Sequence, residues 1–238
     1  MPLPALLAAA ALAGAAALSG RAQAGSRARM TPAQAEAHKA RLVELLRVGR
    51  WQDALELNKA EGEGGLNLRG VNLFRADLAS AELAGANLTG ASLAGANLTG
   101  ASLTGAKLVW VSLTDADLSG ADFIGANLSG ADLTGANLAD VNLAGANLTG
   151  AHLLGAKLSG ANLSGTNLTK AMLIDAYLER VNLADANLTG ANLDGARLPE
   201  GFLSPNTRLD AVPWTGTPFG WRAIASPRGL RFFPLPKA

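Results

Sequence analysis

The chain has 238 residues, a formal net charge of +1 and no cysteine. These values exclude disulfides, thiolate metal sites and a thiol nucleophile, and they give the protein no overall attraction to nucleic acid or to an acidic membrane surface. Apolar residues make up 49% of the chain but aromatic residues only 5%, and there are 28 glycines. This composition predicts a core of leucine and alanine with many tight turns, in one domain or two small ones.

Residues 1–24 have the pattern of a secretory signal peptide. An uncharged run rich in alanine and leucine spans 3–18, and Ala22-Gln23-Ala24 has the small-x-small form of a cleavage site. The run is short and weakly hydrophobic for a transmembrane span. No Lys or Arg precedes it, so the alternative is that translation begins at Met30 and the protein stays in the cytoplasm. We expect export, to the periplasm or as a secreted protein.

Residues 25–65 are expected to form a helical N-terminal region that serves as a cap. Thr31, Pro32 and Gln34 have the spacing of a capping box with proline at the first helical position. Gly49 suits the C-terminal end of this helix. The leucines between them fall on one face at helical spacing: Leu42, Leu45 and Leu46.

A second short helix is predicted from Trp51 to Ala60. Its inner side carries Trp51, Ala54 and Leu55, and the glycine-rich joint at 61–65 ends it. Two short amphipathic helices bury little surface by themselves, so we expect them to lie on another part of the chain.

From Leu68 to Leu198 the chain repeats a five-residue unit without insertion or deletion. Every residue in this range whose number ends in 3 or 8 is leucine except Phe123, which makes 27 consecutive units. Two residues before each unit's leucine stands a small residue, usually alanine, except that Leu66 opens the series. Asn, Asp or Ser mostly precedes the leucine, and glycine mostly stands two after it. A period of five fits neither a helix nor an alternating strand. It predicts stacked units that turn a corner every five residues, with the leucine and the small residue inward and the glycine in a type II turn.

The units Ala-Asn-Leu-Thr-Gly, Ala-Asp-Leu-Ser-Gly and Ala-Asn-Leu-Ser-Gly closely resemble the pentapeptide-repeat family over residues 66–200. The resemblance implies an all-β solenoid, a right-handed, four-sided parallel β-helix with four pentapeptides in each coil. The 27 units then make just under seven coils, and a length of about 32 Å at the spacing of neighbouring strands. Residues twenty apart are expected to lie directly above one another.

Residues 201–238 break the period and are expected to form an irregular C-terminal cap. The segment is rich in aromatic residues and proline, among them Phe202, Trp214, Phe219, Trp221, Phe232, Phe233, Pro205, Pro213 and Pro218. The end of a solenoid exposes its core and an open strand edge, and such a segment can cover both. The alternative is a tail that binds a partner.

The sequence contains no catalytic constellation, and we expect no enzyme activity, no cofactor and no metal. The two histidines, His38 and His152, have no nucleophile or acid at a meaningful spacing. The glycines five apart are the repeat itself rather than a phosphate loop. The Asp and Asn residues lack the glycine-rich nonapeptide signature of calcium-binding solenoids. We interpret the repeated asparagines as ladders that pair with backbone or with one another, the alternative being a flat binding surface.

Departures from the repeat near its C-terminal end form a candidate patch for a protein partner or a second copy. Its residues are His152, Leu154, Lys157, Lys170, Met172, Ile174, Tyr177 and Trp110. Stacking at twenty residues puts His152 below Met172, Leu154 below Ile174 and Lys157 below Tyr177, with Trp110 three coils from Lys170 on one column. Contiguous exposed apolar patches are uncommon on monomers. The patch is therefore either a binding site or a surface that the helices or the tail cover.

Some members of the family resemble a DNA duplex in shape and charge and bind DNA gyrase, a type II topoisomerase. A duplex carries one negative charge per about 1.7 Å. Residues 66–200 contain only 12 acidic residues, against 7 basic ones. The expected column of Asp77 and Asp117 continues into Lys157 and Arg197, so the acids form no stripe. The leading interpretation is an exported, non-catalytic scaffold that binds protein, without nucleic acid or a small-molecule substrate. The alternative is a cytoplasmic DNA mimic that binds gyrase.

Overall fold

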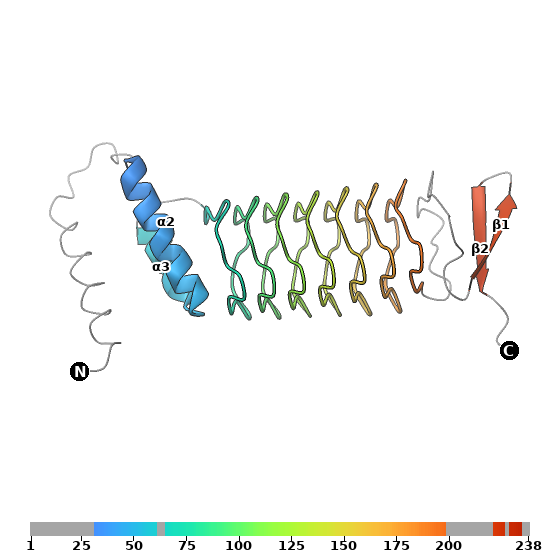
Figure 1. Ribbon diagram of the computed structural model, residues 1–238, viewed down its shortest axis with the longest axis horizontal. Helices are drawn as coiled ribbons and strands as arrows, with labels where there is room; N and C mark the ends of the chain where they lie inside the picture. Colours follow the sequence, from blue (N-terminus) through green and yellow to red (C-terminus); the bar gives the residue numbers. More distant parts are fainter. Residues whose placement is uncertain (1–30, 61–64, 199–220, 227–228, 235–238) are drawn as a thin grey trace. The chain divides into compact units, whose positions relative to one another are not determined.

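The computed structural model describes residues 31–60, 65–198, 221–226 and 229–234 (Figure 1). The chain divides into two compact units, Met1–Ala35 and Glu36–Ala238. The regular elements are α2 (Pro32–Arg47), α3 (Trp51–Ala60), β1 (Trp221–Ser226) and β2 (Gly229–Pro234). The expected signal peptide and most of the expected C-terminal cap lie outside the described residues. Over the ranges that are described, no helix has the length and apolar character needed to cross a bilayer.

Helix α2 begins and ends as its sequence predicts. The Gln34 amide donates to Thr31 Oγ1 at 3.2 Å, and the Thr31 amide donates to Gln34 Oε1 at 2.8 Å, which is the reciprocal capping box. At the other end Gly49 has φ +73°, and the Arg50 amide donates to the Leu45 carbonyl at 2.8 Å. A glycine in the left-handed region closes the helix because it has no Cβ to clash there.

The repeats form a parallel β-solenoid with four pentapeptides in each coil. Each isolated bridge joins residues twenty apart in parallel, for example Asn97 with Asp117. The Leu98 amide donates to the Asp117 carbonyl at 2.7 Å, and the Asp117 amide donates to the Ala96 carbonyl at 2.9 Å. The predicted twenty-residue stacking is confirmed, and Figure 1 shows the successive coils. The right-handed sense of the coil stays a prediction.

Each corner of a coil is a turn that requires a positive φ. The Ala101 amide donates to the Leu98 carbonyl at 3.0 Å, and Gly100 between them has φ +64°. This is the third position of a type II turn, as the glycine spacing predicts. Some described corners instead hold a residue with a side chain, at φ between 53° and 59°: Arg75, Ser80, Trp110, Asp115, Asp140, Lys170, Asp175, Arg180 and Asp185.

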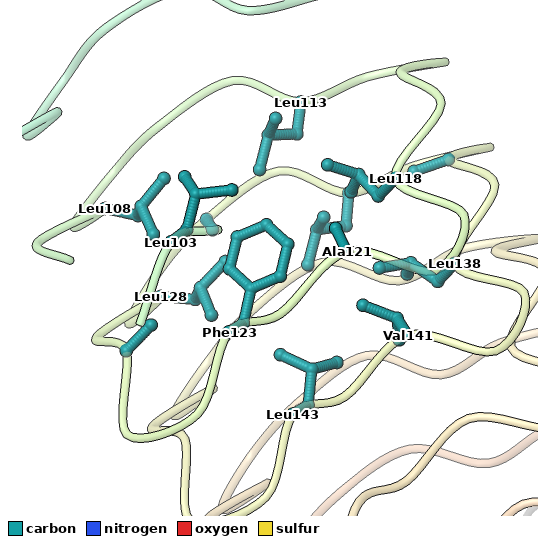
Figure 2. Packing of buried hydrophobic residues seen from close by; sticks show 14 of the residues in the cluster. Leu103, Leu108, Leu113, Leu118, Ala121, Phe123, Leu128, Leu138, Val141 and Leu143 are labelled. Atoms are coloured by element: carbon teal, nitrogen blue, oxygen red, sulfur yellow. The ribbon is translucent and has the colours of Figure 1, made fainter. Parts of the chain in front are cut away.

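The interior of the solenoid consists of the leucine column and the small residues. The leucines from Leu68 to Leu198 are at most 8% exposed, and most are fully buried. Phe123 replaces one leucine at 1% exposure, and its ring lies among Leu103, Leu128 and Leu143 (Figure 2). A buried side chain of this size stabilises the fold by about 1.5–3 kcal/mol relative to exposure. The leucine column is therefore a core rather than a row of ligands.

The two helices contact the first coil through apolar and polar side chains. Leu42, Leu46 and Ala54 are at most 2% exposed and belong to the same buried cluster as the repeat leucines. Lys39 Nζ donates to the Arg69 carbonyl at 2.6 Å, and Arg47 Nε donates to the Asn72 carbonyl at 2.9 Å. In later coils the corresponding carbonyls accept amides from the preceding coil. The first coil has no predecessor, so these two cations satisfy part of its open edge.

The described part of the C-terminal segment is an antiparallel hairpin. Strand β1 pairs with β2 in a register that joins Trp221 to Pro234 and Ser226 to Gly229. This differs from the irregular structure expected for the segment. In the sequence, Pro227 and Arg228 stand between the strands, and Gly229 begins β2. The aromatic and proline content of the segment favoured an irregular structure over a hairpin in the sequence prediction.

Candidate functional site

The candidate patch lies on two adjacent sides of the solenoid near its C-terminal end. His152 bridges Met172, and Lys157 bridges Tyr177 on the next side. The Gly155 amide donates to the Ile174 carbonyl at 2.9 Å, so Leu154 lies one coil below Ile174. The structure therefore brings these six residues together as the sequence predicted. We call His152, Leu154, Met172 and Ile174 the apolar wall.

The apolar wall is open to solvent in the described structure. Leu154 is 43% exposed and Met172 is 40% exposed, His152 is exposed, and Ile174 is half-buried. Other coils carry Asn, Ser, Thr, Ala or Asp at most of the corresponding positions. A small apolar surface thus stands on a side where most outward positions are polar or small, which makes it a candidate interaction site.

Charged and aromatic residues border the apolar wall. On the neighbouring side Arg197 lies over the Tyr177 ring, with its guanidinium carbon 4.6 Å from the ring centroid. This is the geometry of a cation–π contact. Lys157 and Arg197 are exposed in the same column as Tyr177. Lys170 is exposed at the corner on the other side of the wall.

Trp110 is exposed but is separate from the rest of the patch. It lies on the corner column of Lys170, three coils earlier, and is 72% exposed. Its indole covers Gly130 in the next coil, because a Cβ added at Gly130 would lie 2.5 Å from the ring. The repeat geometry thus places a large aromatic side chain on a corner column whose neighbouring positions, Gly90 and Gly130, have no side chain.

The sequence analysis missed Phe74 and Arg75 on the side of the apolar wall. Phe74 is 55% exposed, and the guanidinium carbon of Arg75 lies 5.1 Å from its ring centroid. Phe74 is four coils below Leu154 and five below Ile174 in one column. The signal in the sequence that identifies Phe74 is the twenty-residue period, which places it in the column of Leu154 and Ile174.

The asparagines have a structural role. Asn162 Nδ2 donates to Asn142 Oδ1 at 3.1 Å, and Asn182 Nδ2 donates to Asn162 Oδ1 at 3.2 Å. Many Asn and Asp side chains also accept the amide two residues on, as Asn147 does from Thr149 at 3.1 Å. The predicted ladders are confirmed. Their side-chain amides form hydrogen bonds within the solenoid instead of facing a partner.

Two aspartates on the repeat surface have lowered pKa values for local reasons. The hydroxyl and amide of Ser119 donate to Asp117 Oδ1 at 2.7 and 3.0 Å, and these bonds together with Asn137 lower the pKa of Asp117. Burial raises the pKa of Asp132, but hydrogen bonds from Thr134 and Thr114 and the charge of His152 outweigh it. Both groups favour the ionised form, which suits structure rather than proton transfer.

Within the described ranges no group of three His, Asp or Glu residues could hold a metal ion. His152 stacks on Met172 and Asp132 in its column rather than on a nucleophile. What the site offers is a shaped surface with apolar, aromatic and cationic side chains.

The model of pentapeptide repeats matches the chain in eight copies, over residues 67–105, 101–138, 136–173 and 161–198. The chain belongs to the pentapeptide-repeat family. No curated protein matches this chain at a significant level.

Several solved structures of pentapeptide-repeat proteins are similar to this chain. HetL, involved in heterocyst differentiation regulation in the cyanobacterium Nostoc, is 33% identical, with 61% of this chain and 70% of HetL covered and a TM-score of 0.25. A protein of the Arabidopsis thaliana thylakoid lumen is 36% identical, with 45% and 68% covered and a TM-score of 0.20. QnrB1, a plasmid-mediated fluoroquinolone resistance protein, is 20% identical, with 61% and 78% covered and a TM-score of 0.49. All three TM-scores are below 0.5, so the family assignment rests on the repeats.

Proposed function

We propose that this pentapeptide-repeat protein is an exported, non-catalytic scaffold that binds another protein molecule through the apolar wall. The observation that carries the proposal is the exposure of two large apolar side chains on neighbouring coils of one side, Leu154 at 43% and Met172 at 40%. Protein-binding surfaces are enriched in aromatic residues, Met and Arg relative to the rest of the surface. Tyr177 and Arg197 supply such groups beside the wall.

The charges of the repeats do not support the alternative, a cytoplasmic mimic of DNA. The column that begins with Asp77 and Asp117 ends with Lys157, Tyr177 and Arg197. Asparagines between the acids donate to them, as Asn97 does to Asp77 at 3.0 Å. A duplex mimic needs a continuous line of negative charge, and this column reverses its sign.

The test replaces the wall with residues that the solenoid already uses there. In Leu154→Thr/Ile174→Thr the fold should keep its melting temperature, because threonine suits an outward strand position. The immobilised wild-type protein should retain a defined partner, or itself, from the compartment in which it resides, and the double variant should lose it. The matched control is Ala144→Thr/Ser164→Thr on another side, which should bind as the wild type does. Equal binding by all three proteins would remove the wall as a site.

A further inference from the structure

We propose that the side of the solenoid that carries the apolar wall is self-complementary and joins two copies of this chain in an antiparallel dimer. The inference rests on the proposed function, because it names a second copy as the partner of the wall. One column of this side runs Asn72, Ser92, Ser112, Asp132, His152, Met172 and Asn192 through consecutive bridges. The column two residues on runs Phe74, Ala94, Thr114, Thr134, Leu154, Ile174 and Asp194.

Side-chain size changes in a directed way along this side. The second and third coils carry small residues such as Ser92 and Ala94, and the fifth and sixth carry His152, Leu154 and their neighbours in the wall. Phe74 in the first coil is 55% exposed. In a copy turned end to end, the small residues of the second coil can receive the large residues of the fifth, and Phe74 of the first coil meets an apolar side chain of the sixth.

A two-fold axis that crosses this side between Ser112 and Asp132 produces that fit. Each column then faces itself in reverse order, so that Ala94 faces Leu154 of the partner subunit and Ser92 faces the partner's His152. Phe74 faces the partner's Ile174. A two-fold axis repeats every contact, so each of these pairs occurs twice in an isologous interface. A parallel arrangement would set raised ends against each other and leave the low ends unfilled, which loses packing contacts.

The charges at the rim agree with the same register. Arg75 and Asp175 lie on one corner column, and both are exposed. The axis that pairs Phe74 with the partner's Ile174 also places Arg75 opposite the partner's Asp175. Ser112 faces the partner's Asp132, where its hydroxyl can donate to the carboxylate. The register that side-chain size favours therefore also brings opposite charges together. Such electrostatic complementarity fixes how two surfaces align.

Trp110 lies at the edge of the proposed interface close to the axis. The two-fold axis crosses this corner column between Trp110 and Gly130, so Trp110 faces the partner's Gly130. The indole already extends over Gly130 of its own chain. The two indoles of the dimer are thereby brought towards each other at the rim, and tryptophan is among the residues enriched where interfaces derive their binding energy.

The proposed contact is small. Five coil spacings separate Phe74 from Ile174, which gives a strip about 24 Å long. A strip of this length on one side of a solenoid buries well under the roughly 800 Å² per partner of a standard interface. We therefore expect a weak, concentration-dependent dimer rather than a permanent one.

Cross-linking tests the register directly, because the chain has no native cysteine. Two full-length single variants are made, Ala94→Cys and Leu154→Cys, and treated with a short bismaleimide alone and as a mixture. Residues 94 and 154 are three coils apart, about 14 Å, so neither variant can link to itself in the antiparallel register. The expected result is a covalent dimer in the mixture and none in either variant alone. A covalent dimer of Ala94→Cys alone would overturn the antiparallel register.

A charge exchange tests the same register without chemical modification. Sedimentation velocity over a concentration series should show dimerisation weakened about tenfold or more in Arg75→Asp and in Asp175→Arg, and restored towards the wild-type value when both changes are combined. The control Lys107→Asp makes the same charge change on another side and should dimerise as the wild type does. A monomer at every concentration would overturn this inference, whereas binding of a different protein that depends on Leu154 and Ile174 would leave the proposed function standing.

Discussion

Each position in the five-residue unit has its own physical requirement, and the exceptions show how strict it is. The inward small position accepts Thr166 at 0% exposure only because its Oγ1 donates to the Leu143 carbonyl at 2.8 Å. The inward large position accepts Phe123 but no polar residue between Leu68 and Leu198. The interior therefore tolerates a change of shape more readily than an unsatisfied polar group.

Adjacent inward and outward positions should respond very differently to the same new charge. Leu143 is 1% exposed and Ala144 is half-buried at the next, outward position. Leu143→Asp places an unpaired carboxylate in the core and should lower the free energy of unfolding by about 4 kcal/mol or more. Ala144→Asp should change it by about 1 kcal/mol or less. Chemical denaturation of the two variants measures the difference, and similar losses would mean that the inward positions are misassigned.

The corner glycines should differ in what a methyl group costs. Gly130 and Gly150 both have φ +65°, but a Cβ at Gly130 would meet the Trp110 ring, and one at Gly150 would meet nothing within 4 Å. Gly150→Ala should cost about 1 kcal/mol for the left-handed backbone. Gly130→Ala should cost roughly 1 kcal/mol more, because the indole must move. The excess should vanish in a Trp110→Ala background, and an excess that survives there would contradict the contact.

The acid dependence of stability should include a contribution from Asp117. Hydrogen bonds from Ser119 lower its folded-state pKa below the ordinary value of 3.8. A lowered carboxyl pKa stabilises the fold above the unfolded-state pKa, and this stabilisation is lost as the pH falls through the folded-state pKa. Wild type should therefore exceed Asp117→Asn in stability at neutral pH, and the gap should narrow below about pH 4. Denaturation curves from neutral to acid pH measure the gap, and a constant gap would contradict this assignment.

At the scale of elements, the helices and the first coil complete each other. Helix α2 contributes Leu42 and Leu46 to the core. Its Lys39 and Arg47 side chains donate hydrogen bonds to carbonyls on the open edge. Solenoid repeats contact only their neighbours, so the terminal repeat needs such a cover to stay soluble and ordered. The helices need the coil equally, since short isolated helices are marginal in water.

Loosening α2 should open the N-terminal end without unfolding the middle of the solenoid. Leu46→Ala removes a side chain at 0% exposure and should destabilise its surroundings by about 2–5 kcal/mol. Hydrogen exchange should rise in α2, α3 and the first coil and remain slow around residues 120–160, because coupling passes only between neighbouring coils. Val48→Ala, at 61% exposure, is the control. Uniformly faster exchange along the repeats would show one cooperative unit instead.

At the scale of the whole molecule, the location of the protein decides which partners it can meet. The solenoid has a polar surface with one apolar wall, and this surface would function in any aqueous compartment. The segment 1–24 carries the pattern of a secretory signal peptide. The proposed export and the proposed self-association are thus independent properties that can be tested separately.

Export predicts a specific mature terminus. If the signal peptide is removed after Ala24, the native protein begins at Gly25 and fractionates with the periplasm or the medium. Intact-mass measurement of the protein purified from its own cells checks the terminus. Gln23→Pro leaves the apolar run intact but should block cleavage, leaving a precursor of higher mass. A cytoplasmic protein whose first residue is Met30 would exclude export.

The repeat architecture and the helix boundaries could be predicted from sequence because their causes are local or periodic. The capping box at Thr31, helix α3 over Trp51–Ala60 and the twenty-residue stacking each follow from nearby residues or from a strict period. The contacts of Lys39 and Arg47 join residues 30 and 25 apart, outside any repeat, and only the packing of α2 on the first coil decides them. The position of the Trp110 indole over Gly130 likewise depends on which way a large side chain turns at a corner. The repeat period and the capping residues determine the backbone. The side chains that depart from the repeat pack into the space that neighbouring coils leave, and only the tertiary structure decides where that space is.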